Sequence, residues 1–121
     1  MQGGRTPRWL WLRSRDAVLA VRPRFADLGD LHLGVVAAPG SEGTAVEVRA
    51  FGTDFSEDPV TGSLNAGLAQ WLTDTGVVSA PYVAAQGTAL GRAGRVHVTA
   101  PDGALWVGGR TTTAIAGTVA L

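Results

Sequence analysis

The stretch SEDPVTGSLNAGLAQWL, residues 56–72, contains the clearest helical pattern in the chain. Its large apolar side chains recur at i, i+4, i+7 and i+8 and so share one helix face: Leu64, Leu68, Trp71 and Leu72. Asp58 precedes a proline and is disfavoured in a helix, which leaves Thr61 or Ser63 to cap the first turn. The pattern predicts one main helix from about Ser63 to Thr73, ending before Gly76.

The start of this helix has two interpretations. Glu57, Asp58 and Ser63 are typical of a helix cap and could do no more than cap and solvate the first turn. The first turn also carries unpaired N–H groups and the positive end of the helix dipole, and Gly62 lets a ligand approach them. A substrate carboxylate or phosphate could bind there, with Asp58 orienting a substrate group or moving a proton.

Short β-prone runs surround the helix. They are PRWLWLR, HLGVVAAPG and TAVEVRAF before it, then PYVAAQG, GRVHVTA, ALWVGGR and TTTAIAGTVAL after it. SRDAVLAV and PRFADLGDL predict short helical segments between the first two strands. The sequence therefore predicts an α+β domain with six or seven mostly antiparallel strands and one main helix packed on them.

Composition restricts the chemistry. The 121 residues suit one domain, and ten arginines balance ten acidic residues, so no net charge attracts nucleic acid or a membrane surface. The absence of lysine excludes a Schiff base, and the absence of cysteine excludes disulfides and thiolate catalysis. No apolar run reaches the roughly 20 residues of a membrane span, and the first residues do not resemble a signal peptide, so we expect a cytoplasmic protein.

Isolated polar residues give weaker signals. Glu42 lies in a Gly/Ser turn and Glu47 on an alternating strand, so we expect both to be solvated surface groups. His97 alternates with buried valines and should face solvent or a partner, whereas His32 has no visible partner in the sequence. Arg95 lies beside a glycine turn, where it is either an ordinary surface arginine or an attractor of an anionic substrate.

Three motifs together resemble the C-terminal lobe of the phenazine-biosynthesis PhzF family, which has the diaminopimelate-epimerase-like fold. They are EDPVTGSLNAGLAQWL, AQGTALGRAGRVHV and WVGGRTTTAIAGTV, in this order. The resemblance implies that residues 1–121 form a single lobe without the N-terminal lobe, with a mostly antiparallel, β-barrel-like sheet wrapped around the central helix. It also implies an active site in a cleft between two lobes.

The resemblance assigns roles to six residues. Asp58 matches the family's active-site aspartate and Ser63 assists proton movement. Gly62 and Ser63 match the turn that binds the substrate carboxylate, Thr61 is expected to bind substrate beside them, and Gln86 and Gly87 match a strand end near the cleft. The implied reaction is proton transfer at carbon of a small carboxylate-bearing metabolite, with no metal and no organic cofactor.

The chain departs from the family in length, because a whole member is about twice as long and the other lobe carries its glutamate base. We therefore expect an isomerase whose cleft is completed by a homodimer or by a separate N-terminal-lobe partner. The alternatives are a non-catalytic lobe that binds a small acid or a protein partner, and a truncated gene segment.

Overall fold

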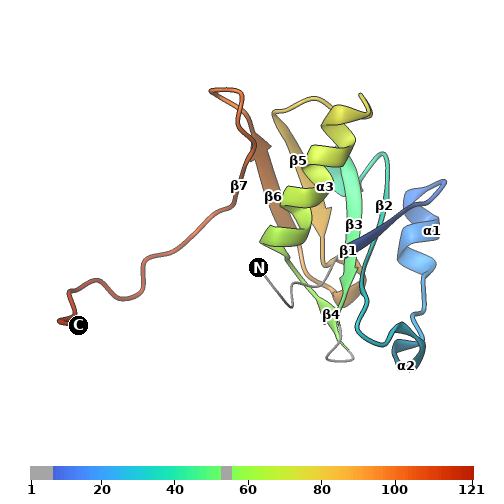
Figure 1. Ribbon diagram of the computed structural model, residues 1–121, viewed down its shortest axis with the longest axis horizontal. Helices are drawn as coiled ribbons and strands as arrows, with labels where there is room; N and C mark the ends of the chain where they lie inside the picture. The colour runs from blue at the N-terminus through green and yellow to red at the C-terminus, as the bar shows by residue number, and fades with distance from the viewer. Residues whose placement is uncertain (1–6, 53–55) are drawn as a thin grey trace.

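The computed structural model describes residues 7–52 and 56–121 and shows one mixed sheet with helices on both faces (Figure 1). Its hydrogen-bonded strand order is β1-β2-β3-β5-β6-β7, and β4 pairs with β3 beside this path. The strands are β1 (Pro7–Trp11), β2 (His32–Ala37), β3 (Val46–Phe51), β4 (Glu57–Asp58), β5 (Tyr82–Gln86), β6 (Gly94–Thr99) and β7 (Trp106–Gly108). The helices are α1 (Arg15–Ala20), α2 (Phe25–Leu28) and α3 (Gly62–Asp74), with 3₁₀ turns at Ser41–Gly43 and Thr88–Leu90.

The expected α+β sheet forms, but it is mixed and open rather than barrel-like. β1 pairs with β2 in parallel and β3 pairs with β5 in parallel, whereas the other pairings are antiparallel. Both parallel pairs are joined through helices, α1 and α2 in the first case and α3 in the second, because a parallel connection needs a crossover. The sheet is also open, since β1 and β7 stand at opposite ends of the strand order.

The main helix forms where the sequence predicts it. α3 runs from Gly62 to Asp74, with Thr61 at the N-cap position and Gly76 at a φ of 76° just after the helix. Three of the four residues of the predicted face are buried, whereas Trp71, at the edge of the stripe, is 37% exposed. The buried face packs on one side of the sheet and builds the larger core with Val36, Val48, Ala84 and Val98.

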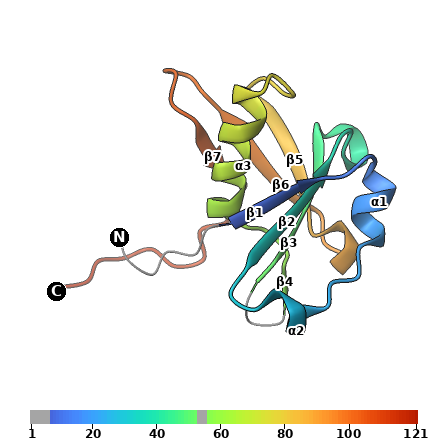
Figure 2. The ribbon, with the colours of Figure 1, turned by 45° about the vertical axis from the view of Figure 1, so that its right-hand side comes forward.

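A second, smaller core lies on the opposite face of β2 and β3. Val18 of α1 packs there with Val35, Ala37 and Phe51. The short helix α1 is capped by Ser14, whose Oγ accepts a hydrogen bond from the Ala17 N–H at 3.0 Å. Figure 2 shows α1 and α2 at the β2 side of the sheet, well separated from α3. The central strands are thus covered on both faces.

This second core overturns the expectation for Glu47. The alternation on β3 is real, with Val46, Val48 and Ala50 toward α3, yet Glu47 is fully buried and Arg49 is 6% exposed. The polar face of β3 is covered by α1 and by the turn Ser41–Gly43. Strand periodicity identifies two faces but does not say whether anything covers them.

The last predicted strand is also absent. Residues 109–121 have no regular secondary structure and all are exposed. The turn between β6 and β7 is as predicted, with Gly103 at a φ of 88°. None of the helices in the described ranges is long and apolar enough to cross a membrane.

Candidate active site

The loop between β4 and α3 holds the candidate acidic residue. β4 pairs with β3 so that Asp58 lies opposite Ala50, at the point where the chain turns toward the helix. The Asp58 carboxylate accepts a hydrogen bond from the Thr61 hydroxyl at 2.8 Å and one from the Val60 N–H at 3.3 Å. Asp58 is exposed, so its carboxylate is oriented by the loop and still open to a ligand.

The side chain of Gln86, at the end of β5, forms hydrogen bonds that hold this loop against the sheet. Its Oε1 accepts from the Thr61 N–H at 3.2 Å and from Asn65 Nδ2 at 2.8 Å. Its Nε2 donates to the Asp58 carbonyl at 2.9 Å and to Thr61 Oγ1 at 3.1 Å. The same Thr61 hydroxyl then donates to the Asp58 carboxylate, so Gln86 fixes the orientation of that carboxylate through Thr61.

Two glycines allow the loop to lie this close to the sheet. A Cβ on Gly87 would stand 2.8 Å from the Pro59 carbonyl oxygen, and the φ of Gly87 is 85°. A Cβ on Gly94 would stand 2.6 Å from the Gln86 carbonyl oxygen and 2.6 Å from Val60 Cγ2. Larger residues at either position would push the loop away from Gln86, because no backbone tolerates contacts this short.

The sequence-predicted residues do not all face the same space. Asp58, Thr61 and Ser63 line one cavity of about 390 Å³, together with His32 and Leu64. Gly62 lines a neighbouring cavity of about 470 Å³ on the β6–β7 side. Gln86 and Gly87 are buried beneath the loop. The structure therefore brings three of the six to one cavity, places Gly62 at a second cavity and buries Gln86 and Gly87.

The two acidic residues of the loop differ in their surroundings, because Glu57 forms a buried ion pair and Asp58 does not. Glu57 Oε1 lies 2.7 Å from Arg49 Nη2, and both side chains are 7% exposed. Arg49 also donates to the carbonyls of Val18 and Val21, at 3.0 and 2.8 Å, near the end of α1. Because Arg49 satisfies Glu57, Asp58 is the carboxylate of this acidic pair that remains open to the cavity.

The helix adds a favourable field for an anion. The amides of Gly62 and Ser63 have no intrahelical acceptor in an α-helix, and the first turn of α3 contains no acidic residue. A carboxylate beside this turn would be favoured by the aligned peptide dipoles. The cavity thus has an oriented carboxylate beside a helix start whose dipole favours anions.

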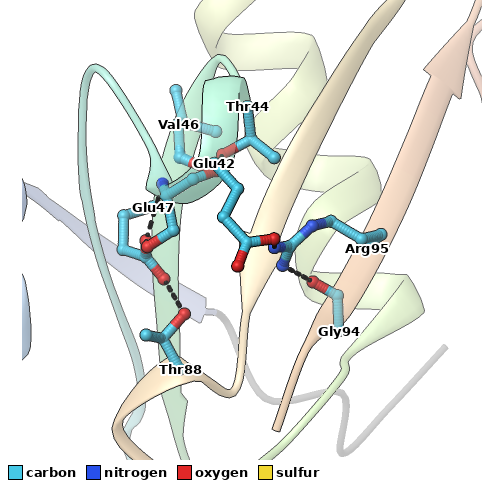
Figure 3. Close-up of polar contacts among 8 residues, drawn as sticks. Glu42, Thr44, Val46, Glu47, Thr88, Gly94 and Arg95 are labelled. Atoms are coloured by element: carbon cyan, nitrogen blue, oxygen red, sulfur yellow. Dashed lines mark hydrogen bonds and ion pairs between the residues drawn. The ribbon is translucent and has the colours of Figure 1, made fainter.

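Sequence reasoning gave no role to two residues that the fold brings near the site. His32, at the start of β2, lines the same cavity as Asp58, and only the pairing of β2 with β3 reveals this. Glu47 accepts hydrogen bonds from Ser41 and from the Thr88 hydroxyl, the latter at 2.6 Å, and thereby ties β3 to the turn that follows Gly87 (Figure 3). No residue pattern at these positions signals either arrangement.

Glu42, in contrast, lies at the surface as expected. Its side chain is 81% exposed and forms an ion pair of 2.9 Å with Arg95, which also donates to the Gly94 carbonyl (Figure 3). His97 is exposed on β6, also as expected. Within the residues that the structure describes, no cluster of three histidine or acidic side chains could hold a metal ion.

The fold and the cavity define a class: an α+β lobe with an oriented carboxylate beside a helix N-terminus that favours anions. The chain belongs to the PhzC–PhzF family of phenazine biosynthesis-like proteins, whose family model matches residues 3–119. The resemblance seen in the three sequence motifs is thereby confirmed. A comparison with curated proteins found no match.

Solved structures agree with this family. One relative is a Clostridium difficile (strain 630) protein described as a phenazine biosynthesis PhzC/PhzF protein, with 26% identity and a TM-score of 0.63. The match covers 90% of this chain and 45% of that one. A PhzF-family protein from Enterococcus faecalis shares the fold at 22% identity and a TM-score of 0.57, over 82% of this chain and 41% of that one. The chain thus spans less than half the length of these relatives.

Proposed function

We propose that this protein is a PhzF-like isomerase that moves a proton between carbon atoms of a small carboxylate-bearing metabolite. Membership in the phenazine biosynthesis-like family supports an isomerase-type reaction. The observation that carries the proposal is the Asp58 carboxylate, oriented by Thr61 and Val60 at a cavity that also contains the start of α3. We also propose that the protein acts in the cytoplasm.

Each residue has a proposed role. The substrate carboxylate binds the amides of Gly62 and Ser63, and the Ser63 hydroxyl assists the proton transfer. Asp58 removes a proton from one carbon, the double bond shifts along the substrate, and a proton is returned to another carbon. Thr61 keeps the Asp58 carboxylate oriented.

Gln86 and Gly87 contribute to the same substrate site from beneath the loop. Gln86 holds the loop through four hydrogen bonds, and Gly87 leaves room for Pro59. They shape the pocket that the substrate enters, and the ligand itself contacts the loop and the helix.

A second chain completes the cleft in this proposal. The chain spans 45% and 41% of the two solved relatives, and the cavity beside Asp58 is open to its surroundings. A second copy of the chain, or a separate partner lobe, would cover the substrate and exclude water from the reacting carbon. Closing the cavity also strengthens the electrostatic effect of Asp58 on the reaction.

Hydrogen–deuterium exchange tests the proposal. The protein is incubated in heavy water with a panel of α-amino acids and cyclic unsaturated carboxylic acids, and loss of the C–H signal is followed by proton NMR. Asp58→Asn should slow any enzyme-dependent exchange at least about 100-fold, which is the lower end of general acid–base effects.

Asp102→Asn is the matched control. The Asp102 carboxylate is exposed and accepts from the Ala104 N–H at 3.3 Å, the same arrangement that Asp58 has with Val60. This variant should exchange at the wild-type rate. Equal rates for Asp58→Asn and wild type, in a sample that exchanges substrate, would rule out the catalytic role of Asp58.

The alternative is a non-catalytic lobe that binds a small acid or a protein partner. One observation favours it: Glu57 is paired with Arg49, which leaves Asp58 as the open carboxylate of the cavity, and the first turn of α3 contains no acidic residue, so it can bind an anion without any proton transfer. Saturable binding of a carboxylic acid in calorimetry, without exchange in heavy water by the chain in any assembly, would favour this alternative.

A further inference from the structure

His32, the first residue of β2, shares a cavity with Asp58 without a role in the reaction proposed above. Side chains alternate along a strand, and Val36 of β2 packs into the core beneath α3. His32 lies four positions before Val36, so its side chain is on the same face of the sheet. The cavity of about 390 Å³ that contains Asp58 and Ser63 is on this face, and His32 forms part of its wall.

The strand register places His32 and Asp58 at two ends of this cavity. β2, β3 and β4 run side by side (Figure 2). Gly34, Ala50 and Asp58 lie in one row across these strands, and His32 lies two residues before Gly34. Two strand spacings and the rise of two residues separate the Cα atoms of His32 and Asp58 by about 12 Å. Both side chains extend into the cavity, so the space between them suits a small molecule.

The space between the two ends is lined by apolar side chains. Ala50, on the strand between β2 and β4, has a short side chain that leaves this part of the cavity open. Leu64 of α3 also borders the cavity and is 5% exposed. The start of α3 is at the Asp58 end, because the Thr61 hydroxyl donates to the Asp58 carboxylate. A ligand would therefore meet a helix start, an apolar middle and an imidazole in turn.

His32 is the basic side chain among the described residues that line this cavity. It is partly buried, and within the ranges that the structure describes it forms no hydrogen bond or ion pair. Arg49, the arginine beside the loop, is already paired with Glu57 and donates to carbonyls of α1. An imidazole donates an N–H in both protonation states, and its charged form also attracts anions. The end of the cavity away from Asp58 thus favours an anionic acceptor.

We propose that His32 is a substrate-binding residue that selects acids with a second anionic group at the end remote from Asp58. The first carboxylate binds at the start of α3, and the apolar middle of the substrate lies along Ala50 and Leu64. The second carboxylate accepts a charge-assisted hydrogen bond from the His32 imidazole. The inference rests on the proposed function for the first carboxylate, and it adds the substrate class: short-chain dicarboxylic acids.

Proton NMR of the two histidines tests this directly. The chain contains only His32 and His97, so their imidazole Cε1–H signals are resolved as a pair. His97 is exposed on β6 and outside this cavity, which makes it an internal control. The chain is titrated at fixed pH and ionic strength with glutarate and with pentanoate, a monocarboxylate of the same length. Succinate with butyrate and adipate with hexanoate test shorter and longer molecules.

Dicarboxylates of the fitting length should shift both the Ser63 amide and the His32 imidazole, whereas the matching monocarboxylate should shift only the Ser63 amide. His32→Leu should weaken dicarboxylate binding at least about 10-fold and change monocarboxylate binding less than about twofold, because a hydrogen bond to a charged group is lost. His32→Gln retains an N–H donor and should keep most of the preference. His97→Leu is the matched control and should bind both acids as the wild type does.

The outcomes separate this inference from the proposed function. A Ser63 amide that responds while the His32 signal stays in place, or equal wild-type affinity for the two acids of every pair, would overturn the role of His32 and leave the first carboxylate site intact. No response of the Ser63 amide to any acid would overturn both. The wild-type signals decide this even if a variant fails to fold, and they require no turnover.

Discussion

Replacing Gln86 by leucine should destabilise the protein by about 2–4 kcal/mol. Leucine keeps the approximate volume and removes four hydrogen bonds, each with a net value of about 0.5–1.5 kcal/mol. Two of the partners keep another bond, since Asn65 Nδ2 also donates to the Thr61 carbonyl and the Thr61 hydroxyl also donates to Asp58. The expected loss of stability is therefore in the lower part of the roughly 2–6 kcal/mol that four independent hydrogen bonds would give.

Urea unfolding followed by circular dichroism measures this change. Gln70→Leu is the control, because Gln70 is exposed and its side-chain amide donates to the exposed Asp74 carboxylate. The control should stay within about 0.5 kcal/mol of wild type. If Gln86→Leu lost less than about 1 kcal/mol, the hydrogen bonds of Gln86 would not hold the loop in the way the structure indicates. Gln86→Glu should also be destabilising, because a carboxylate cannot donate to the Asp58 carbonyl.

Three further predictions concern stability and use the same unfolding measurement. Glu57→Ala should cost about 3 kcal/mol or more, because it leaves a buried arginine unpaired, whereas Glu42→Ala removes an exposed pair and should cost less than about 1 kcal/mol. Gly94→Ala should destabilise by about 1–3 kcal/mol through its clash with the loop, whereas Gly67→Ala, with open space around it, should stabilise the helix by about 0.5–1 kcal/mol. Burial raises the pKa of Tyr82 to about 12, so the free energy of unfolding should fall by at most roughly 2 kcal/mol as pH rises from 10 to 12. Tyr82→Phe should abolish this fall.

In this chain a change of stability between pH 10 and pH 12 can be assigned to Tyr82. Tyr82 is the only tyrosine, and the chain has neither lysine nor cysteine, so no other side chain of the ordinary set loses a proton in that pH range. The phenol stays neutral in the folded protein while the unfolded chain ionises above pH 10, and the extra ionisation favours unfolding. A pH dependence that survives in the phenylalanine variant would contradict this explanation.

The elements with strong local signals could be predicted. Asp58 before Pro59, the cap position at Thr61 and the leucine spacing predict α3 to within a residue at each end. The strands β2, β3, β5 and β6 follow apolar runs between turn residues. These signals are local because they depend on backbone sterics and side-chain spacing within a few residues.

The candidate site could be predicted only in part. The motif around Asp58 and Ser63 indicates a helix start that favours anions. No sequence pattern near Gln86 indicates that its side-chain amide donates to the Asp58 carbonyl, 28 residues earlier in the chain. His32 reaches the cavity only because β2 pairs with β3. Assignments that rest on the family resemblance remain predictions until the exchange experiment is done.

The sequence by itself determined which residues form α3, which runs are strands, and which chemistries a chain without lysine and cysteine excludes. Only the tertiary structure decided which faces are covered, and it buried Glu47 and Arg49 between β3 and the segments above it. It also left residues 109–121 unpaired, although their pattern is that of a strand. The physical reason is the same in both cases: periodicity is a property of a few neighbouring residues, whereas burial and strand pairing depend on what other parts of the fold supply.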